Sequence, residues 1–145
     1  MAATYNKFQD FIEQLCLAKH NLNTDQLNVY LSNAAPSASL DAVKADLAEI
    51  ATGNGYSADG TDTQNTFAES GGTGTLTGTK VVFTASGGTI GPFQYVALLN
   101  VTQTSPLKPL IGWWDYASAL TLQDGETFSV KFNSSDTTGT ILTLA

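Results

Sequence analysis

Cys16 and His20 are the one pair of side chains in this sequence that could supply a thiol nucleophile and its general base. They lie four residues apart, a spacing that could bring thiol and imidazole together on a helix. Catalysis would also need an orienting group and an oxyanion site. Cys16 falls on or beside an apolar stripe, and His20 falls where the helix is expected to end. We therefore interpret Cys16 as a packing residue and His20 as a polar helix terminus.

Two turn-rich stretches resemble ligand-binding loops. Gly53, Gly55 and Ala58 match the spacing of a dinucleotide loop, but an expected helix precedes them and turns follow, the reverse of the required strand-to-helix order. Residues 59–62 (DGTD) suggest a calcium loop, yet the position of its bidentate glutamate is occupied by Ser70. We interpret both stretches as turns and leave open a structural ion at the second.

Three carboxylates could be combined for glycosidase chemistry. Asp124 and Glu126 flank an expected turn, which favours a solvated role, whereas Asp115 lies between Trp114 and Tyr116. Aromatic rings beside a carboxylate can form a sugar-binding platform. Strand alternation over residues 113–116 sends the two tryptophans to opposite faces, so one is expected to pack in the core while the other covers an edge or contacts a partner. The sequence predicts no catalytic residue, no cofactor, no metal ligand and no enzyme activity.

The composition limits the partners. The net charge is −7, the pI is about 4.3 and no arginine is present, so neither nucleic acid nor an anionic membrane surface is expected to bind. Only 13% of residues are charged, against about 25% in typical soluble domains, so much of the surface must consist of uncharged polar side chains. Such a surface suits an extracellular or virion β-protein, or a protein largely covered by partners.

Cysteine content and hydropathy limit the compartment and stabilising devices. A single cysteine excludes an intramolecular disulfide, and no apolar run reaches 18 residues. The N-terminal residues show no basic segment followed by an apolar one, so we expect synthesis in a cytoplasm.

Two helices are expected in the first third of the chain. Residues 6–19 carry Phe8, Phe11, Ile12, Leu15 and Cys16 at the spacing of one apolar stripe, within an N-terminal helical segment over residues 1–22. A second, short helix is expected near residues 40–52, where apolar residues recur at helical spacing before a glycine.

Short strands separated by glycine-rich turns dominate residues 23–145. A central hairpin over residues 92–116 holds both tryptophans in two apolar runs. Residues 26–32 alternate apolar and polar side chains and predict a half-buried strand. Further strands are expected over residues 63–68, 73–79, 80–85, 128–132 and 140–144. The pattern predicts one mainly β domain over residues 1–145, an antiparallel β-sandwich of jelly-roll-like type.

Several stretches resemble a family of small virion structural proteins of tailed bacteriophages. They are, in order, YNKFQDFIEQL, HNLNTDQLNVYLSNAAP, LAEIATGNGYSADG, SGGTIGPFQYVALLN, PLIGWWDYASALTLQDGETFSVKF and ILTL. EIATGNGY and LIGWWDY are the most specific of these. Asp59 and Gly60 stand where the family often has two glycines.

The resemblance implies a decoration, or cement, protein on the capsid exterior. Such proteins bind the major capsid protein as dimers or trimers across capsomer junctions and brace the shell. A tail or neck structural protein, or a receptor- or glycan-binding virion module, is the alternative. The N-terminal helix and the proline loop at residues 102–109 are the expected contact elements, although the helix is expected first to cover its own sheet. Candidate contacts are Tyr5, Phe8, Phe11, Thr104, Pro106, Leu107, Lys108 and Trp114.

Overall fold

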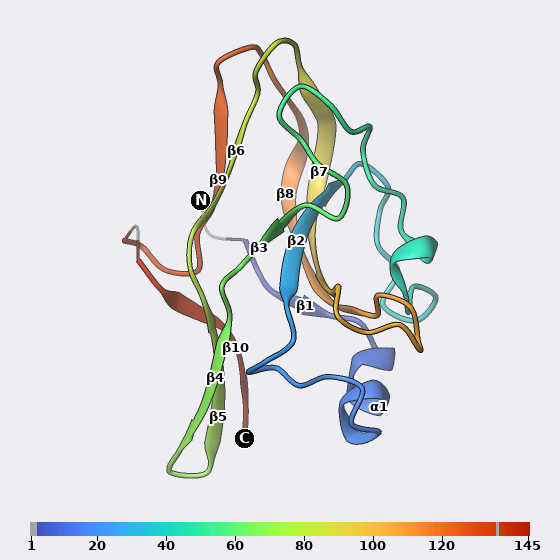
Figure 1. Ribbon diagram of the computed structural model, residues 1–145, viewed down its shortest axis with the longest axis vertical. Helices are drawn as coiled ribbons and strands as arrows, with labels where there is room; N and C mark the ends of the chain where they lie inside the picture. The colour runs from blue at the N-terminus through green and yellow to red at the C-terminus, as the bar shows by residue number, and fades with distance from the viewer. Residues whose placement is uncertain (1–2, 136) are drawn as a thin grey trace.

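The computed structural model describes residues 3–135 and 137–145 and confirms a mainly β fold of antiparallel sheets (Figure 1). A five-stranded sheet has the order β1-β8-β7-β2-β3, a three-stranded sheet has the order β10-β5-β4, and β6 pairs with β9. The elements are β1 Asn6–Lys7, α1 Asp10–Cys16, β2 Leu27–Ser32, the 3-10 helix η1 Lys44–Asp46, β3 Thr61–Asp62, β4 Thr66–Ser70, β5 Thr73–Gly78, β6 Val81–Thr84, β7 Ile90–Asn100, β8 Leu110–Leu122, β9 Thr127–Val130 and β10 Gly139–Leu144.

The predicted hairpin is the centre of the largest sheet. Its strands β7 and β8 pair from Ile90 opposite Leu122 to Leu99 opposite Leu110, so the pairing extends well beyond the apolar runs that predicted it. β2 adds to the outer edge of β7, and β1 adds to β8. The other predicted strands are present, with ends shifted by a few residues.

The main core lies between the five-stranded sheet and the two smaller sheets. Val29 and Leu98 enter it from the large sheet, and Leu76, Phe83 and Ile141 enter it from the opposite strands. Apolar residues therefore face each other from two layers of sheet. The predicted jelly-roll connectivity stays a prediction.

A second apolar cluster covers the other face of the large sheet. Phe8, Tyr30, Leu47, Leu99 and Leu110 pack together there, and the Tyr30 hydroxyl donates to the backbone oxygen of Leu47 at 3.1 Å. All six residues of β2 are consequently buried. The prediction of a half-buried strand is wrong, because the segment after β2 folds back over the face that alternation left polar.

The predicted N-terminal amphipathic helix over residues 6–19 is not confirmed. α1 spans Asp10–Cys16 only, since Asn6 and Lys7 pair with the edge of β8, and Ala18 adopts a left-handed backbone with φ of 59°. Of the predicted stripe, Phe8 precedes the helix and Ile12 is 39% exposed. Backbone pairing to an open strand edge therefore takes precedence over the helical periodicity.

The second predicted helix, near residues 40–52, is reduced to the single turn η1. The flanking backbone is extended and bonded to the segment that enters β8: Val43 bridges Pro109, and the N–H of Leu110 donates to the oxygen of Ala42. Leu40 is 79% exposed. The helical spacing of apolar residues was misleading because Leu47 is buried in the second cluster and Ile50 packs against the main core, so the set does not form one helix face.

Candidate partner-binding surfaces

Cys16 and His20 do not form a catalytic pair. The Cys16 thiol is exposed at the end of α1, so the interpretation of Cys16 as a packing residue is wrong, whereas the His20 ring is buried and packs against Phe11 with ring centroids 5.3 Å apart. The polar partner of His20 is Asn100, the last residue of β7, 80 residues away in sequence. The expectation of a polar helix terminus is therefore wrong for His20, which is a buried structural group.

The hydrogen bonds of Asn100 define the state of His20. Asn100 Oδ1 accepts the backbone N–H groups of Thr102 at 3.0 Å and Gln103 at 3.3 Å. Its Nδ2 therefore donates, to the Asp25 carboxylate at 2.7 Å and to His20 Nδ1 at 3.1 Å. An accepting Nδ1 makes His20 neutral with its proton on Nε2. This cluster fixes the first turn of the loop at residues 102–109.

Burial controls the titration of this cluster. It lowers the pKa of His20 from 6.5 to about 4, although the carboxylates of Asp25 and Asp10 act in the opposite direction. Burial alone would raise the pKa of Asp25, but hydrogen bonds from Asn21, Asn100 and Gln103 outweigh it and lower that pKa. The folded state thus favours a neutral imidazole beside an ionised carboxyl.

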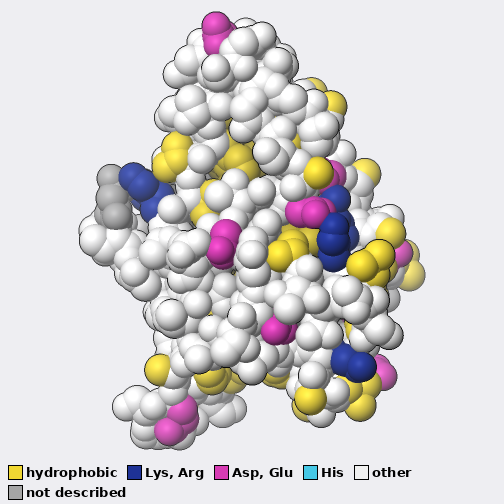
Figure 2. Space-filling view, in the orientation of Figure 1, with side chains coloured by type: hydrophobic (Ala, Val, Ile, Leu, Met, Phe, Trp, Pro, Cys, Tyr) yellow, Lys and Arg dark blue, Asp and Glu magenta, His cyan; other side chains and the backbone are white. Residues whose placement is uncertain are grey.

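Exposed aliphatic side chains gather on one side of the molecule, which we call the loop edge. Leu40 is 79% exposed, Leu107 is 61% exposed, and Ile12 on α1 and Leu17 directly after it are exposed as well. α1, the segment around η1 and the loop between β7 and β8 lie together on this side (Figure 1), where Figure 2 shows hydrophobic side chains. The loop edge comprises Ile12, Leu17, Leu40 and Leu107.

Backbone hydrogen bonds join the three segments of the loop edge. The N–H of Gln9 donates to the oxygen of Ala38 at 2.9 Å and ties the start of α1 to the segment that carries Leu40. The N–H of Lys44 donates to the oxygen of Lys108 at 3.0 Å and ties η1 to the proline loop. The aliphatic side chains are therefore carried by three segments that are linked to one another.

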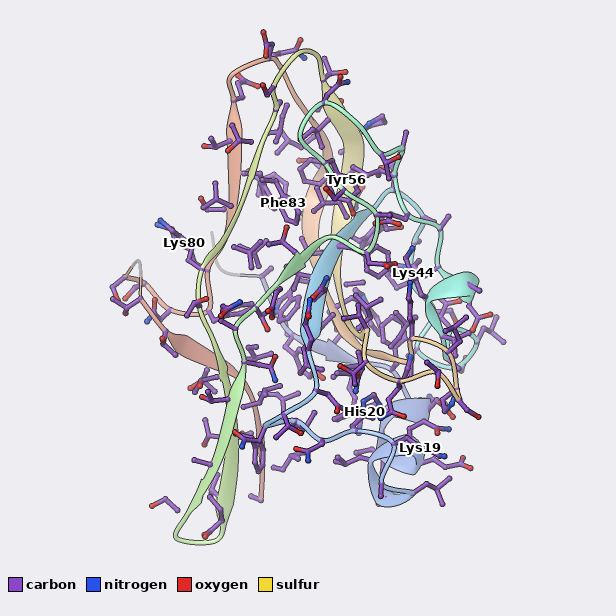
Figure 3. The ribbon with its side chains drawn as sticks, in the orientation of Figure 1. Lys19, His20, Lys44, Tyr56, Lys80 and Phe83 are labelled. Atoms are coloured by element: carbon purple, nitrogen blue, oxygen red, sulfur yellow. The ribbon has the colours of Figure 1, made fainter. Side chains whose placement is uncertain are left out.

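An ion network lies beside the loop edge. Lys44 Nζ contacts Glu49 at 2.7 Å and Asp59 at 2.9 Å, while Lys108 Nζ contacts the other oxygen of Asp59 at 2.6 Å. Tyr56, which packs on Phe83 (Figure 3), donates its hydroxyl to Glu49 at 2.8 Å. Two lysines and two carboxylates leave this network neutral, so it stiffens the surface without adding net charge.

The network favours the ionised forms of Asp59 and Lys44. Burial alone would raise the pKa of Asp59, but Lys108 and Lys44 outweigh burial and lower it. Burial alone would lower the pKa of Lys44, but Glu49 and Asp59 outweigh that effect and raise it. Residues 59–62 were interpreted from the sequence as a turn that could hold a structural ion. In the fold, Asp59 of this turn binds two lysines instead.

Backbone geometry places Asp59 in this network. Asp59 and Gly60 both have left-handed φ angles, 66° and 68°. A Cβ on Gly60 would collide with the backbone of Val29 and Tyr30, so this position requires glycine. Two glycines would suit the same turn, and aspartate at the first position adds the carboxylate that binds Lys44 and Lys108.

An open aromatic groove of about 890 Å³ lies on the other side, next to β9. Trp114 from β8 contacts Tyr5 at 5.6 Å and Phe132 at 5.9 Å between ring centroids. Tyr116 contacts Phe128 edge to face at 5.6 Å. The remaining lining residues are Ala3, Val96, Thr127, Ser129, Val130, Lys131, Asn133, Ser134, Thr140 and Ile141.

Gly112 explains how Tyr5 reaches this groove. A Cβ on Gly112 would collide with the Tyr5 ring, so the glycine lets that ring cross β8 beside β1. The Tyr5 hydroxyl donates weakly to the oxygen of Ile111 at 3.4 Å, and burial raises its pKa. The glycine of the LIGWWDY motif is thus a packing requirement for the N-terminal segment.

The predicted contact residues fall into three environments. Phe8 and Phe11, at 0% and 1% exposure, are packed inside and are not available to a partner in this structure. Tyr5 and Trp114 line the aromatic groove, while Trp113 packs on Phe8 in the second cluster. The loop residues Thr104, Pro106, Leu107 and Lys108 lie on the side of the loop edge, where Lys108 belongs to the ion network.

Sequence reasoning missed two parts of these surfaces. Lys44, Glu49 and Asp59 were not singled out as a group, because no local pattern signals pairs that form across separate loops. Phe128 and Phe132 were assigned only to a strand, and their alternation with polar residues could have indicated a wall facing Trp114.

No protein-family model matches the chain, and neither a curated protein nor a solved structure matches it. Among residues 3–135 and 137–145, no helix is long and apolar enough to cross a membrane. The same residues contain no group of three or more His, Cys, Asp or Glu side chains that could hold a metal ion.

Proposed function

We propose that this protein is a non-enzymatic virion structural protein of a tailed bacteriophage that decorates the outside of the capsid and stabilises it. In this proposal it is a single-domain, jelly-roll-like β-sandwich that binds the major capsid protein, associates with itself as a dimer or trimer, and is made in the host bacterial cytoplasm. The motifs EIATGNGY and LIGWWDY support the phage assignment.

The loop edge is the observation that carries the capsid proposal. Its four exposed aliphatic side chains stand on segments linked by backbone hydrogen bonds and flanked by an ion network of paired charges. A surface that is apolar, has its neighbouring charges paired and is already ordered loses little conformational entropy on docking. We assign this edge as the contact with the shell.

The test is the number of copies per particle, measured by quantitative mass spectrometry of purified virions against the major capsid protein. A decoration protein is present in hundreds of copies, in a fixed ratio to the shell subunit. A few copies would contradict the proposal and would favour the alternative of a tail or neck component, or of a receptor- or glycan-binding module at one vertex.

A further inference from the structure

We propose that the aromatic groove binds an extended, uncharged segment of the shell protein, which adds a strand along β9. This inference rests on the proposed function, since the occupant is a segment of the protein to which the loop edge docks. It concerns a second surface, on the side of β9 and the N-terminal residues, away from the loop edge (Figure 1).

One edge of β9 is free. β9 pairs only with β6, so among the described residues its other edge has no strand partner. The groove is lined by every residue from 127 to 134, which means that it follows the strand and its continuation rather than one face of it. β9 itself, Thr127–Val130, spans about 13 Å, and the chain bends over residues 132–135 beyond it. Alternate backbone N–H and C=O groups of such an edge can pair with an added peptide.

The open edges of β8 and β4 are blocked against an added strand. On β8, the Asp115 carboxylate accepts the N–H of Ala117 at 2.7 Å, and Ala117 has a left-handed φ of 73°. On β7, Tyr95 is opposite Asp115 of β8 and Phe93 is opposite Leu120. Four residues of β8 therefore lie where β7 has only one, so the edge is bulged. On β4, the N–H of Phe67 is already bound by Asn23 Oδ1 at 3.1 Å. In the described part of the chain, β6 and β10 also have an unpaired edge, but β6 lines none of the groove and β10 contributes only Thr140 and Ile141 to it. β9 is therefore the open edge that follows the groove.

The wall of the groove opposite β9 is aromatic. Trp114 and Tyr116 of β8 face a segment lying along β9, and aromatic surfaces accept the apolar side chains that an extended peptide presents at every second position. Among residues 3–135 and 137–145, no Asp or Glu lines the groove, and Lys131 is the one charged side chain in its lining. This local charge favours an uncharged segment over a strongly basic one.

The test uses overlapping 12-residue peptides that cover the major capsid protein of the particle carrying this chain, with binding measured by fluorescence anisotropy. We expect one segment with apolar residues at alternate positions and no net positive charge to bind. Tyr116→Ala should weaken that binding at least 10-fold, and Ala3→Trp should do the same by filling the rim. Ala51→Trp, an exposed alanine outside the groove, is the matched control and should bind normally. Hydrogen exchange at residues 127–130 should slow when the peptide is bound.

Intact shells separate this inference from the proposed function. If the full protein binds shells that lack it but no peptide binds, or the bound peptide leaves residues 127–130 unprotected, the strand inference is overturned while the decoration proposal stands. If the full protein does not bind shells, the decoration proposal fails. Binding of host lipopolysaccharide that is lost in Tyr116→Ala, or a dimer that dissociates in this variant, would also overturn the inference by assigning the groove to another occupant.

Discussion

The loop edge and the aromatic groove arrange apolar side chains in opposite ways. On the loop edge, Leu40 and Leu107 project outward from loops joined by hydrogen bonds and ion pairs. In the groove, rings such as Trp114 and Phe132 lie along the walls of a hollow beside a free strand edge. The first suits an apolar surface of a partner, and the second suits a segment that enters it.

The two surfaces also differ in what holds them in place. The loop edge depends on contacts between distant segments, in which Asp59 joins Lys44 and Lys108. The groove depends on ring contacts along neighbouring strands, and in the part of the chain that the structure describes neither a carboxylate nor a histidine lines it. Changes that act on charge should therefore affect the loop edge first.

The largest expected effect on stability comes from Gly60. Gly60→Val should lower the free energy of unfolding by about 3 kcal/mol or more, because a side chain there collides with the Val29 backbone and the left-handed φ adds strain. Urea unfolding measures the change. Gly71→Val is the matched control: its φ is also left-handed, at 62°, but no atom lies within 4 Å, so it should lose only about 1–2 kcal/mol. Equal losses would show that the turn at Gly60 is not packed as described.

Acid should weaken the support of the loop at residues 102–109 through His20. The folded pKa of about 4 lies below the ordinary 6.5, so between these values the unfolded chain binds more protons. Stability is therefore lost as pH falls from 6.5 to 4, by about 3 kcal/mol for a shift of this size. Chemical denaturation across this range measures the slope.

His20→Gln is the control for the acid effect, because glutamine does not titrate. Its stability should change much less between pH 6.5 and 4 than that of the unmodified protein, even if its absolute stability is lower. The same slope in both proteins would mean that another group dominates and that the neutral His20 paired with Asn100 is not the acid-sensitive element.

A smaller loss is expected from Asp59→Asn. The substitution removes the charge that binds Lys44 and Lys108 but keeps the shape, and since the partners are partly solvated the cost should be about 1–2 kcal/mol. Because the pKa of Asp59 is lowered on folding, its contribution is present above the ordinary value of 3.8 and disappears below it. Unfolding at pH 7 and at 1 M salt measures it. Glu13→Gln on α1 is the control and should leave the free energy of unfolding unchanged. An Asp59→Asn variant with unchanged stability would contradict the role of the network.

Strand periodicity predicted the centre of the fold and one wall of the groove. The apolar runs around Trp113 and Trp114 correctly indicated a hairpin with the tryptophans on opposite faces, because side-chain direction in a strand is a local property. The extent of α1 and the second helix were not predictable in this way. Their backbone groups bond to β8 and to residues 108–110, which are far away in the sequence.

The loop edge illustrates a further limit of sequence reasoning. The proline loop was singled out, and Leu107 is indeed exposed, but Leu40, on another segment of the loop edge, was one of the apolar residues whose spacing predicted a helix near residues 40–52. The Asp59 carboxylate was considered for calcium, whereas in the fold two lysines surround it. Each residue was visible in the sequence, but its partners are determined by tertiary structure.

The most direct test of the central claim is binding to shells that lack this protein, measured by cosedimentation. Leu40→Asp combined with Leu107→Asp should leave stability within about 0.5 kcal/mol, because both side chains are largely exposed. This variant should lose shell binding at least 10-fold, while Val82→Asp, at an apolar position on β6 that is 42% exposed and away from the loop edge, should bind normally. Full binding by the Leu40→Asp, Leu107→Asp variant would contradict the assignment of the loop edge as the shell contact.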